Sequence, residues 1–143
     1  MGEEAVRELY ERVGGTVLNN PDRKSPDWDL LVLLHQHVFL AEVKVDLMAP
    51  RTGNLAIEWW NPRRNGPSGI SATTADLWFV LVGKDLWVAP VPALKSFFHS
   101  NPGRDVMGAG DGNSTVRLYP CSSLLNSIFS LAESHARLLT SLQ

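Results

Sequence analysis

Two apolar runs, Asp29–His35 and Val38–Val45, constrain the fold more than any other feature of the sequence. The first run has the length of a strand, and the second (VFLAEVKV) is rich in residues that favour strands. The connection between them, around Gln36, is short. The pattern therefore predicts an antiparallel hairpin, with both strands buried.

Periodicity and chain-breaking residues predict the elements around this hairpin. Apolar residues at helical spacing indicate a helix over Glu3–Val13, which Gly14-Gly15 ends. Further along the chain we expect a short strand at Thr16–Leu18, a turn at Asn19–Asp22, a loop at Arg51–Asn54, a third strand of the same sheet at Leu55–Trp60, one or two helical turns in Gly69–Asp76, a hairpin of Leu77–Val82 and Leu86–Ala89, a short helix at Pro92–His99, a mobile loop at Asn101–Asn113, an edge strand at Ser114–Tyr119 and an amphipathic helix at Ser122–Leu142. This order predicts a single α/β domain over residues 1–143 with a mixed sheet.

Composition narrows the class of protein. Hydrophobic residues make up 44% of the 143 residues and charged residues 20%, as in ordinary soluble domains. No apolar run approaches the roughly 20 residues that cross a bilayer, and the acidic N-terminus does not resemble a secretory signal. The only cysteine is Cys121, which excludes an intrachain disulfide and a cysteine zinc site. We therefore expect a protein of the reducing cytoplasm, with no membrane partner.

The formal net charge of −2 argues against a protein that coats nucleic acid by electrostatics alone, because such proteins are usually basic. A metal-dependent nuclease is a partial exception. Its carboxylates lower the charge of the metal-free chain, and bound cations restore positive charge where the phosphate lies.

The second apolar run carries two charged residues. Glu42 and Lys44 are two positions apart on a strand, so their side chains project from the same face, while Val43 points the other way. Burying a carboxylate and an ammonium group in such a strand is unfavourable because both are desolvated. Either the pair serves a chemical purpose or it is a salt bridge on an exposed edge strand.

Carboxylates also precede the first strand, where Ser25-Pro26-Asp27-Trp28-Asp29 leads into the apolar run. Carboxylate oxygens and a backbone carbonyl on rigid strands form a hard-oxygen site that suits Mg²⁺ or Mn²⁺. In this interpretation Asp29 and Glu42 bind the metal with the Val43 carbonyl, and Lys44 positions the attacking water. Phosphodiester hydrolysis needs this combination of groups.

The stretch from Ser25 to Lys44 resembles the Pro-Asp…(Asp/Glu)-x-Lys motif of the PD-(D/E)XK nuclease superfamily. This superfamily includes restriction endonucleases, Holliday-junction resolvases and small phage-encoded endonucleases. The segments Arg51–Glu58 and Gly66–Trp78 also resemble phage-type members. The resemblance covers roughly residues 22–90, and residues 108–120 more loosely.

The resemblance implies a restriction-endonuclease-like fold, a mixed four-strand core flanked by helices, with metal ligands on the second and third strands. Asp27 follows the proline directly, but Asp29 leads straight into the apolar strand and stands thirteen positions before Glu42, as in resolvases. We take Asp29 as the ligand and keep Asp27 as the alternative. Alignment of the helix-ending glycines with those of resolvases adds Glu4 as a further metal ligand; its alternative is a solvated helix charge.

Other residues are candidates for supporting roles. Glu58 lies between tryptophans and needs a partner, such as a second metal ion, Lys44 or an arginine. The segment after Pro67 can present hydroxyl and N–H groups to a phosphate, although ordinary helix capping by Ser68 or Ser71 explains it equally well. The full set of candidate DNA contacts is Arg51, Arg63, Arg64, Ser68, Thr73, Thr74 and Lys84.

The sequence thus predicts a Mg²⁺- or Mn²⁺-dependent DNA endonuclease, and the resemblance implies branched DNA as a substrate and a homodimer in a prokaryotic or phage-infected cell. The last helix, with its broad apolar face, is the candidate dimer interface unless it packs on its own sheet. The rival interpretation is a catalytically silent DNA-binding or assembly module that keeps the nuclease fold.

Overall fold

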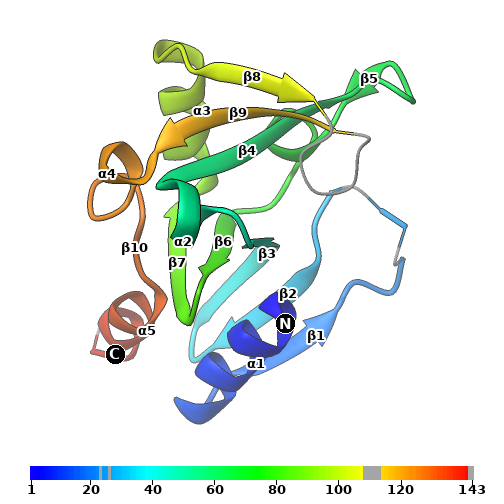
Figure 1. Cartoon of the computed structure of the whole chain (residues 1–143). Coiled ribbons are helices and arrows are strands. Elements are labelled where there is room, and N and C mark those ends of the chain that lie inside the picture. Colours follow the sequence, from blue (N-terminus) through cyan, green and yellow to red (C-terminus); the bar gives the residue numbers. More distant parts are fainter. Residues whose placement is uncertain (23, 26, 108–113, 142–143) are drawn as a thin grey trace.

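The computed structural model describes residues 1–22, 24–25, 27–107 and 114–141, and it contains two sheets (Figure 1). The six-stranded sheet has the order β1-β2-β3-β6-β7-β10, with β1 (Thr16–Asn19), β2 (Leu30–Leu34), β3 (His37–Asp46), β6 (Leu77–Val82), β7 (Asp85–Pro90) and β10 (Ser130–Leu131). The four-stranded sheet has the order β5-β4-β9-β8, with β5 (Gly66–Pro67), β4 (Asn54–Asn61), β9 (Thr115–Pro120) and β8 (Arg104–Met107).

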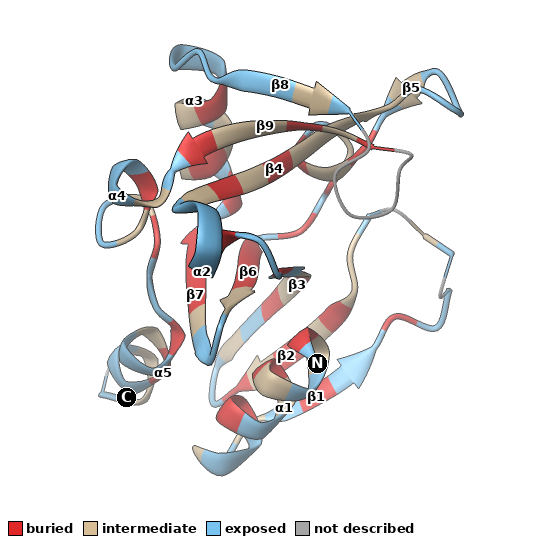
Figure 2. Cartoon of the chain, in the orientation of Figure 1, coloured by how far each residue is buried: buried red, intermediate tan, exposed pale blue. Residues whose placement is uncertain are grey.

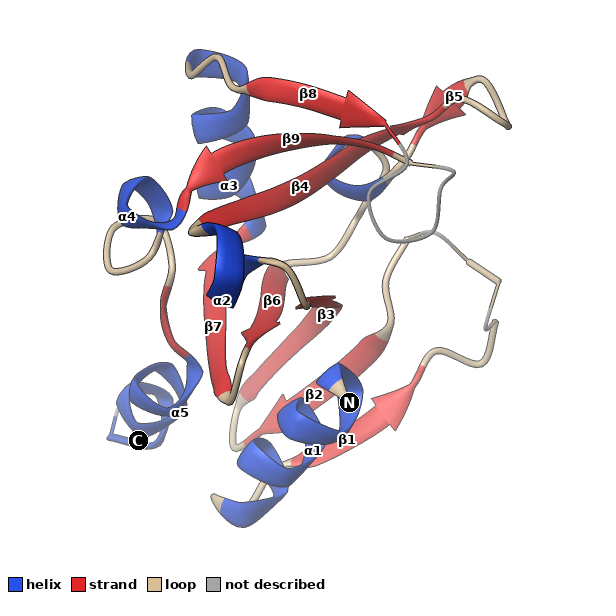
Figure 3. Cartoon of the chain, viewed as in Figure 1, coloured by secondary structure: helices blue, strands red, loops and turns tan. Residues whose placement is uncertain are grey.

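The helices flank these sheets (Figure 3). They are α1 (Gly2–Arg12), α2 (Ala49–Thr52), the 3-10 turn η1 (Gly69–Ser71), α3 (Val91–Ser100), α4 (Cys121–Leu124) and α5 (Ala132–Ser141). None of the described helices is long and apolar enough to cross a membrane.

The predicted central hairpin is confirmed. β2 and β3 pair antiparallel from Leu34↔His37 to Leu30↔Ala41, and His35 enters the turn with a φ of 55°. β1 continues the antiparallel pattern on β2, whereas β3 pairs parallel with β6. The six-stranded sheet is therefore mixed, and the predicted mixed α/β class is correct.

The two faces of the six-stranded sheet pack against different layers, because side chains alternate along each strand. Phe39, Ala41 and Phe79 lie in a core that α1 and α5 cover, whereas Trp78 and Val80 lie in a second core with α3 and the four-stranded sheet. The buried positions are red in Figure 2. Glu42 is in register with Trp78, so Glu42 and Lys44 face the second sheet and not α1.

The prediction that residues 55–60 form a third strand of the hairpin's sheet is wrong, since β4 belongs to the four-stranded sheet. Asp46 explains the change of direction. Its carboxylate accepts hydrogen bonds from the backbone N–H groups of Met48, Ala49 and Ala56, which folds α2 back over the end of β3. Gly53, with a φ of 75°, then turns the chain into β4. As a result β6, and not β4, pairs with β3.

Two predictions about the segment after α3 are also wrong. Residues 101–113 were expected to form a loop, but β8 lies within them and pairs antiparallel with β9; residues 108–113 are outside the described part of the chain. Residues 114–119 were expected to form an edge strand, but β9 lies between β4 and β8. Pairing between distant segments decided both outcomes, and local patterns do not reveal such pairing.

The predicted helix over residues 122–142 is interrupted. Asn126 has a φ of 68°, and the Ser127 hydroxyl donates to the carbonyls of Ser123 and Leu124, which ends α4. Phe129, 1% exposed, enters the core on the α3 side, whereas Ala132 of α5 enters the core on the α1 side. A single straight helix cannot reach both cores, so an extended segment connects α4 and α5.

Candidate functional site

Asp29 and Glu42 lie directly opposite each other at the end of the β2–β3 hairpin. The last paired residues are Leu30 and Ala41, and the Asp29 backbone N–H donates to the Ala41 carbonyl at 2.8 Å. The Asp29 carboxylate accepts a hydrogen bond from the Val43 backbone N–H at 2.8 Å. This carboxylate therefore takes the place that the backbone of β2 would have filled, had the strand continued.

Glu42 is the more deeply buried of the two acids, with a residue exposure of 7%. The pKa of its carboxyl group is raised to about 8, mainly by burial and then by a hydrogen bond to the Asp29 carboxyl group and by the negative charge of Asp29. The Lys44 charge and the contact with the Thr73 hydroxyl oppose this rise in pKa. The raised pKa favours the protonated form of Glu42, hydrogen-bonded to Asp29, while no cation is bound.

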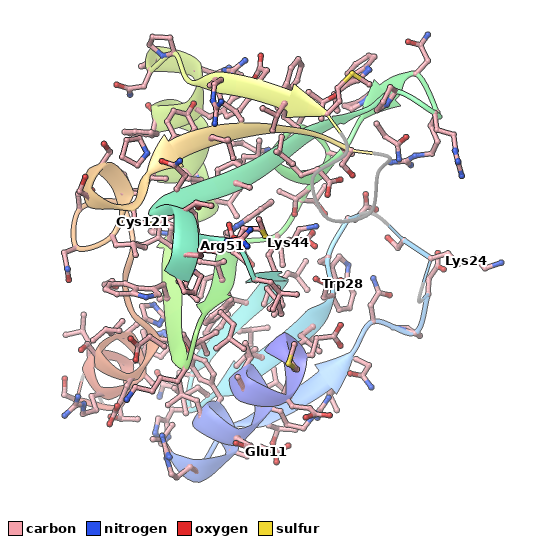
Figure 4. All side chains as sticks on the ribbon, in the orientation of Figure 1. Glu11, Lys24, Trp28, Lys44, Arg51 and Cys121 are labelled. Carbon is pink, nitrogen blue, oxygen red and sulfur yellow. The ribbon has the colours of Figure 1, made fainter. Side chains whose placement is uncertain are left out.

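Lys44 links the acid pair to the second sheet. Its Nζ lies 3.9 Å from Oε2 of Glu42 and 3.7 Å from Oε1 of Glu58, and 5.7 Å from the centre of the Trp78 ring. Figure 4 shows Lys44 in the space between β3 and β4. Lys44, one of the partners expected for Glu58, thus contacts it, and this contact joins two segments that belong to different sheets.

A close turn fixes the position of Glu58 on β4. Gly69 has a φ of +50°, and a Cβ atom on it would lie only 2.1 Å from the Glu58 carbonyl oxygen. The pairing of β4 with β9 also shifts between Glu58 and Trp60, which indicates a β-bulge. This geometry needs glycine at position 69, because any side chain there would push Glu58 away.

Thr73 links the Glu42 carboxyl group to the backbone at Asp27. It is 2% exposed, and its hydroxyl donates to the Asp27 carbonyl at 2.9 Å, accepts from the Ala75 N–H and contacts the Glu42 carboxyl group. The Asp27 side chain itself is exposed, and the Asp27 contribution to this arrangement comes through its backbone carbonyl. Of the two candidate aspartates, the geometry therefore places Asp29 beside Glu42.

The acid pair and the neighbouring Val43 carbonyl have the chemistry of a binding site for a hard divalent cation. Mg²⁺ commonly binds through one or two carboxylates and keeps several water ligands, and Asp29 and Glu42 supply two carboxylates in contact. N–H and C=O of a strand residue point to the same side, so the Val43 carbonyl lies on the Asp29 side of β3. Within the described residues no group of three His, Cys, Asp or Glu side chains is placed to hold a metal. The donor set is thus two carboxylates and a carbonyl.

Glu4 lies elsewhere. It is exposed on α1 and lines a hollow of about 490 Å³ with Val43 and Val45, whose side chains point away from the Glu42–Lys44 face. The structure does not bring Glu4 together with Asp29 and Glu42.

The candidate DNA contacts are spread over the molecule. Arg51 lies in α2, Arg63 and Arg64 lie in the turn between β4 and β5, and Lys84 lies in the turn between β6 and β7; all four are exposed, as is Thr74. Ser68 and Thr73 are each 2% exposed, and Ser68 is the N-cap residue of η1 without a capping hydrogen bond from its side chain. The hydroxyls of these last two residues face the interior.

Sequence reasoning missed the wall opposite Lys44. A groove of about 340 Å³ runs from Lys44 and Glu58 across the open face of the second sheet to Arg104 on β8. The predicted loop over residues 101–113 hid this wall, which includes β8. Residues 104–107 do not alternate between polar and apolar, so no local pattern indicated the strand.

Comparison of this chain with models of protein families, with curated proteins and with solved structures finds no match.

Proposed function

We propose that this protein is a Mg²⁺- or Mn²⁺-dependent DNA endonuclease of the PD-(D/E)XK class, with a restriction-endonuclease-like fold. The observation that carries the proposal is the contact between Asp29 and Glu42 at the end of a buried hairpin, with Lys44 two positions further on the same face. Burial makes the charged form of Glu42 unfavourable, and a divalent cation bound to Asp29 and Glu42 in place of the proton would offset that cost.

The order of the strands supports the same class. The resemblance implies a mixed four-strand core with metal ligands on its second and third strands. The strands β1-β2-β3-β6 form a mixed group in which only β3 and β6 run parallel, and the acid pair lies on the segment that enters β2 and on β3. α1 and α5 flank this group on one face.

The residues divide the chemistry among them. Asp29, Glu42 and the Val43 carbonyl would hold the cation, which when bound neutralises phosphate charge and makes a bound water more acidic. The Lys44 ammonium group lies beside Glu42, where it would orient the attacking water or stabilise negative charge on the phosphate oxygens. Glu58 and Glu42 hold Nζ of Lys44 between them, and Thr73 holds the Glu42 carboxyl group. The Asp29 carboxylate is kept in place by the Val43 N–H.

The test is cleavage of single-stranded, duplex, flap and four-way-junction DNA with Mg²⁺, Mn²⁺ or EDTA. We expect metal-dependent cleavage by the wild type, and a loss of at least 100-fold in Lys44→Ala and Glu42→Gln, as removal of one charge-stabilising group typically gives. Arg137→Ala is the matched control, because Arg137 is an exposed cation on α5, distant in sequence and fold. Calorimetry of Mn²⁺ binding to Glu42→Gln separates loss of metal from loss of chemistry.

Each outcome discriminates between proposals. Cleavage that persists in Glu42→Gln would show that another site does the chemistry. A folded wild-type protein that binds DNA and cuts none of these substrates would favour the silent binding module. The molecular mass in solution tests the proposed homodimer, for which the exposed Leu131 and Leu138 beside and within α5 are the candidate contacts.

A further inference from the structure

The groove beside Lys44 has an apolar middle and a cation at each side. Its floor and walls come from five strands and from the α2 segment. The lining includes Val80, Val106, Val116, Leu118, Ala56 and Trp78, which is 1% exposed. Its volume of about 340 Å³ lies near the lower end of the range for small-molecule sites.

Register places the two cations. Across the second sheet Glu58, Val116 and Val106 form one row, and Ala56, Leu118 and Arg104 form the next. Lys44 contacts Glu58 at the β4 side, whereas Arg104 is on β8, two strands away, or roughly 10 Å. Arg104 is exposed and forms no ion pair with any described residue. The apolar stretch thus lies between Lys44 and Arg104.

The two carboxylates in the groove are already engaged. Glu58 contacts Lys44 at 3.7 Å, and the Asp46 carboxylate accepts three backbone hydrogen bonds. Asn54 also lines the groove, and its side-chain amide makes no hydrogen bond to a described residue. Lys44 is already in contact with Glu58 and Glu42, so the groups without a partner among the described residues are the Arg104 guanidinium, the Asn54 amide and the apolar surface.

We propose that this groove binds one unpaired nucleobase of the strand that is cut, next to the phosphate at Asp29, Glu42 and Lys44. The inference rests on the proposed nuclease function and names its substrate class: DNA with an unpaired or unstacked nucleotide beside the scissile bond. The aliphatic walls can cover a base whatever its identity, and the phosphates on its two sides match Lys44 and Arg104. A continuous duplex keeps its bases stacked inside and presents none of them to a groove of this size.

The binding arm of the test does not depend on cleavage. A short single strand with one 2-aminopurine is titrated with protein in Ca²⁺ and in EDTA, and base fluorescence reports entry into an apolar groove. We expect Val106→Trp, which fills the groove, and Arg104→Ala, which removes an exposed cation, to weaken binding by about tenfold or more. Val38→Trp is the control for the first variant, since Val38 is 64% exposed at the far end of the hairpin, and Arg12→Ala on α1 is the control for the second.

The cleavage arm uses the preferred substrate and the same substrate with an abasic nucleotide beside the cut bond. We expect the abasic substrate to be cut about tenfold more slowly. Equal rates for the two would overturn the groove assignment and leave the nuclease proposal intact. Absence of cleavage on every substrate would overturn the nuclease proposal. The 2-aminopurine titration would then decide by itself whether the groove binds a base.

Two further outcomes would overturn the assignment of the groove to a DNA strand. Binding of free dAMP as tight as that of the strand would make the groove a mononucleotide site. A dimer in solution that Val106→Trp, but not Val38→Trp, dissociates would make it a contact between two copies. Circular dichroism of each variant confirms the fold, and Arg104→Ala keeps the test decisive if Val106→Trp does not fold.

Discussion

The Glu42 carboxyl group determines how the site responds to pH. Its pKa is raised from 4.5 to about 8, mainly by burial. Between these two values the folded state binds more protons at this position than the unfolded state does. Linkage therefore requires the stability contributed by Glu42 to fall as pH rises through this window. A substitution that removes the Glu42 carboxyl group should therefore abolish this loss of stability at high pH.

We predict that Glu42→Gln, without divalent metal, is more stable than the wild type at pH 9 by on the order of 2 kcal/mol, and that this advantage disappears near pH 5. Gln has nearly the same shape and can donate to the Asp29 carboxylate, so packing should change little. Urea unfolding at pH 5, 7 and 9 measures the difference. Glu133→Gln, an exposed substitution on α5, is the control and should show no such trend. A stability difference that stays constant with pH would contradict the raised pKa.

At the scale of elements, the turn at η1 is coupled to β4 through Gly69. A Cβ atom at this position would lie 2.1 Å from the Glu58 carbonyl oxygen, whereas one at Gly53 would have nothing within 4 Å. Both glycines have positive φ, so both substitutions bring backbone strain. Only Gly69→Ala adds a collision.

We predict that Gly53→Ala lowers the free energy of unfolding by about 1 kcal/mol and Gly69→Ala by about 3 kcal/mol or more. Gly69→Ala should also reduce metal-dependent cleavage, because it moves Glu58 away from Lys44. Chemical denaturation and cleavage rates of both variants measure this. Similar losses of stability in the two variants would show that the turn tolerates a side chain and that Glu58 is not fixed by it.

The helices α1 and α5 meet at a hydrogen bond between the Tyr10 hydroxyl and Nδ1 of His135, 3.1 Å apart. Tyr10 is fully buried, which raises the pKa of its hydroxyl, so it stays protonated and is hydrogen-bonded to a neutral His135. Burial and then the nearby His37 lower the pKa of His135 below 6.5. As pH falls through 6.5 the unfolded state takes up a proton first, so the stability contributed by His135 is lost.

We predict that between pH 8 and pH 5 the wild type loses more of its unfolding free energy than His135→Asn, which does not titrate but can still hydrogen-bond to Tyr10. Unfolding by urea across this range measures the difference. His99→Asn, an exposed change at the end of α3, should leave the wild-type pH dependence unaltered. Parallel curves for wild type and His135→Asn would show that His135 does not control the docking of α5.

Across the whole molecule, the sequence predicted the features that depend on residues close together in the chain, and it did not predict those that depend on distant segments. The β2–β3 hairpin, the β6–β7 hairpin and the opposition of Asp29 to Glu42 follow from short connections and strand alternation. The sheet to which β4 belongs, the interior position of β9 and the break after α4 depend on pairings between segments far apart in the chain. The same limit applies to the site, where the Lys44–Glu58 contact and the groove to Arg104 exist only once two sheets are placed together.

The distribution of charge over the whole molecule predicts how it should bind DNA. The net charge is −2, and the exposed candidate cations Arg51, Arg63, Arg64 and Lys84 lie on three separate segments. Without a cation the acid pair of Asp29 and Glu42 offers no positive charge to a phosphate, whereas a bound divalent cation would supply it. Few phosphate contacts should therefore form, and most of the attraction should come from the metal.

We predict that flap DNA binds at least tenfold more tightly in Ca²⁺ than in EDTA, and that log K falls with log salt concentration with a slope of only about −2 to −4. Fluorescence anisotropy of a labelled flap substrate over a series of salt concentrations measures both quantities. Glu42→Gln should lose most of the Ca²⁺ effect, while Glu133→Gln keeps it. A slope near −8 without a metal effect would mean that a broad basic surface forms on binding, which would favour a DNA-coating module over a metal-centred nuclease. A shallow slope with a strong metal effect would place the attraction at the acid pair, because that is where cation and phosphate would meet.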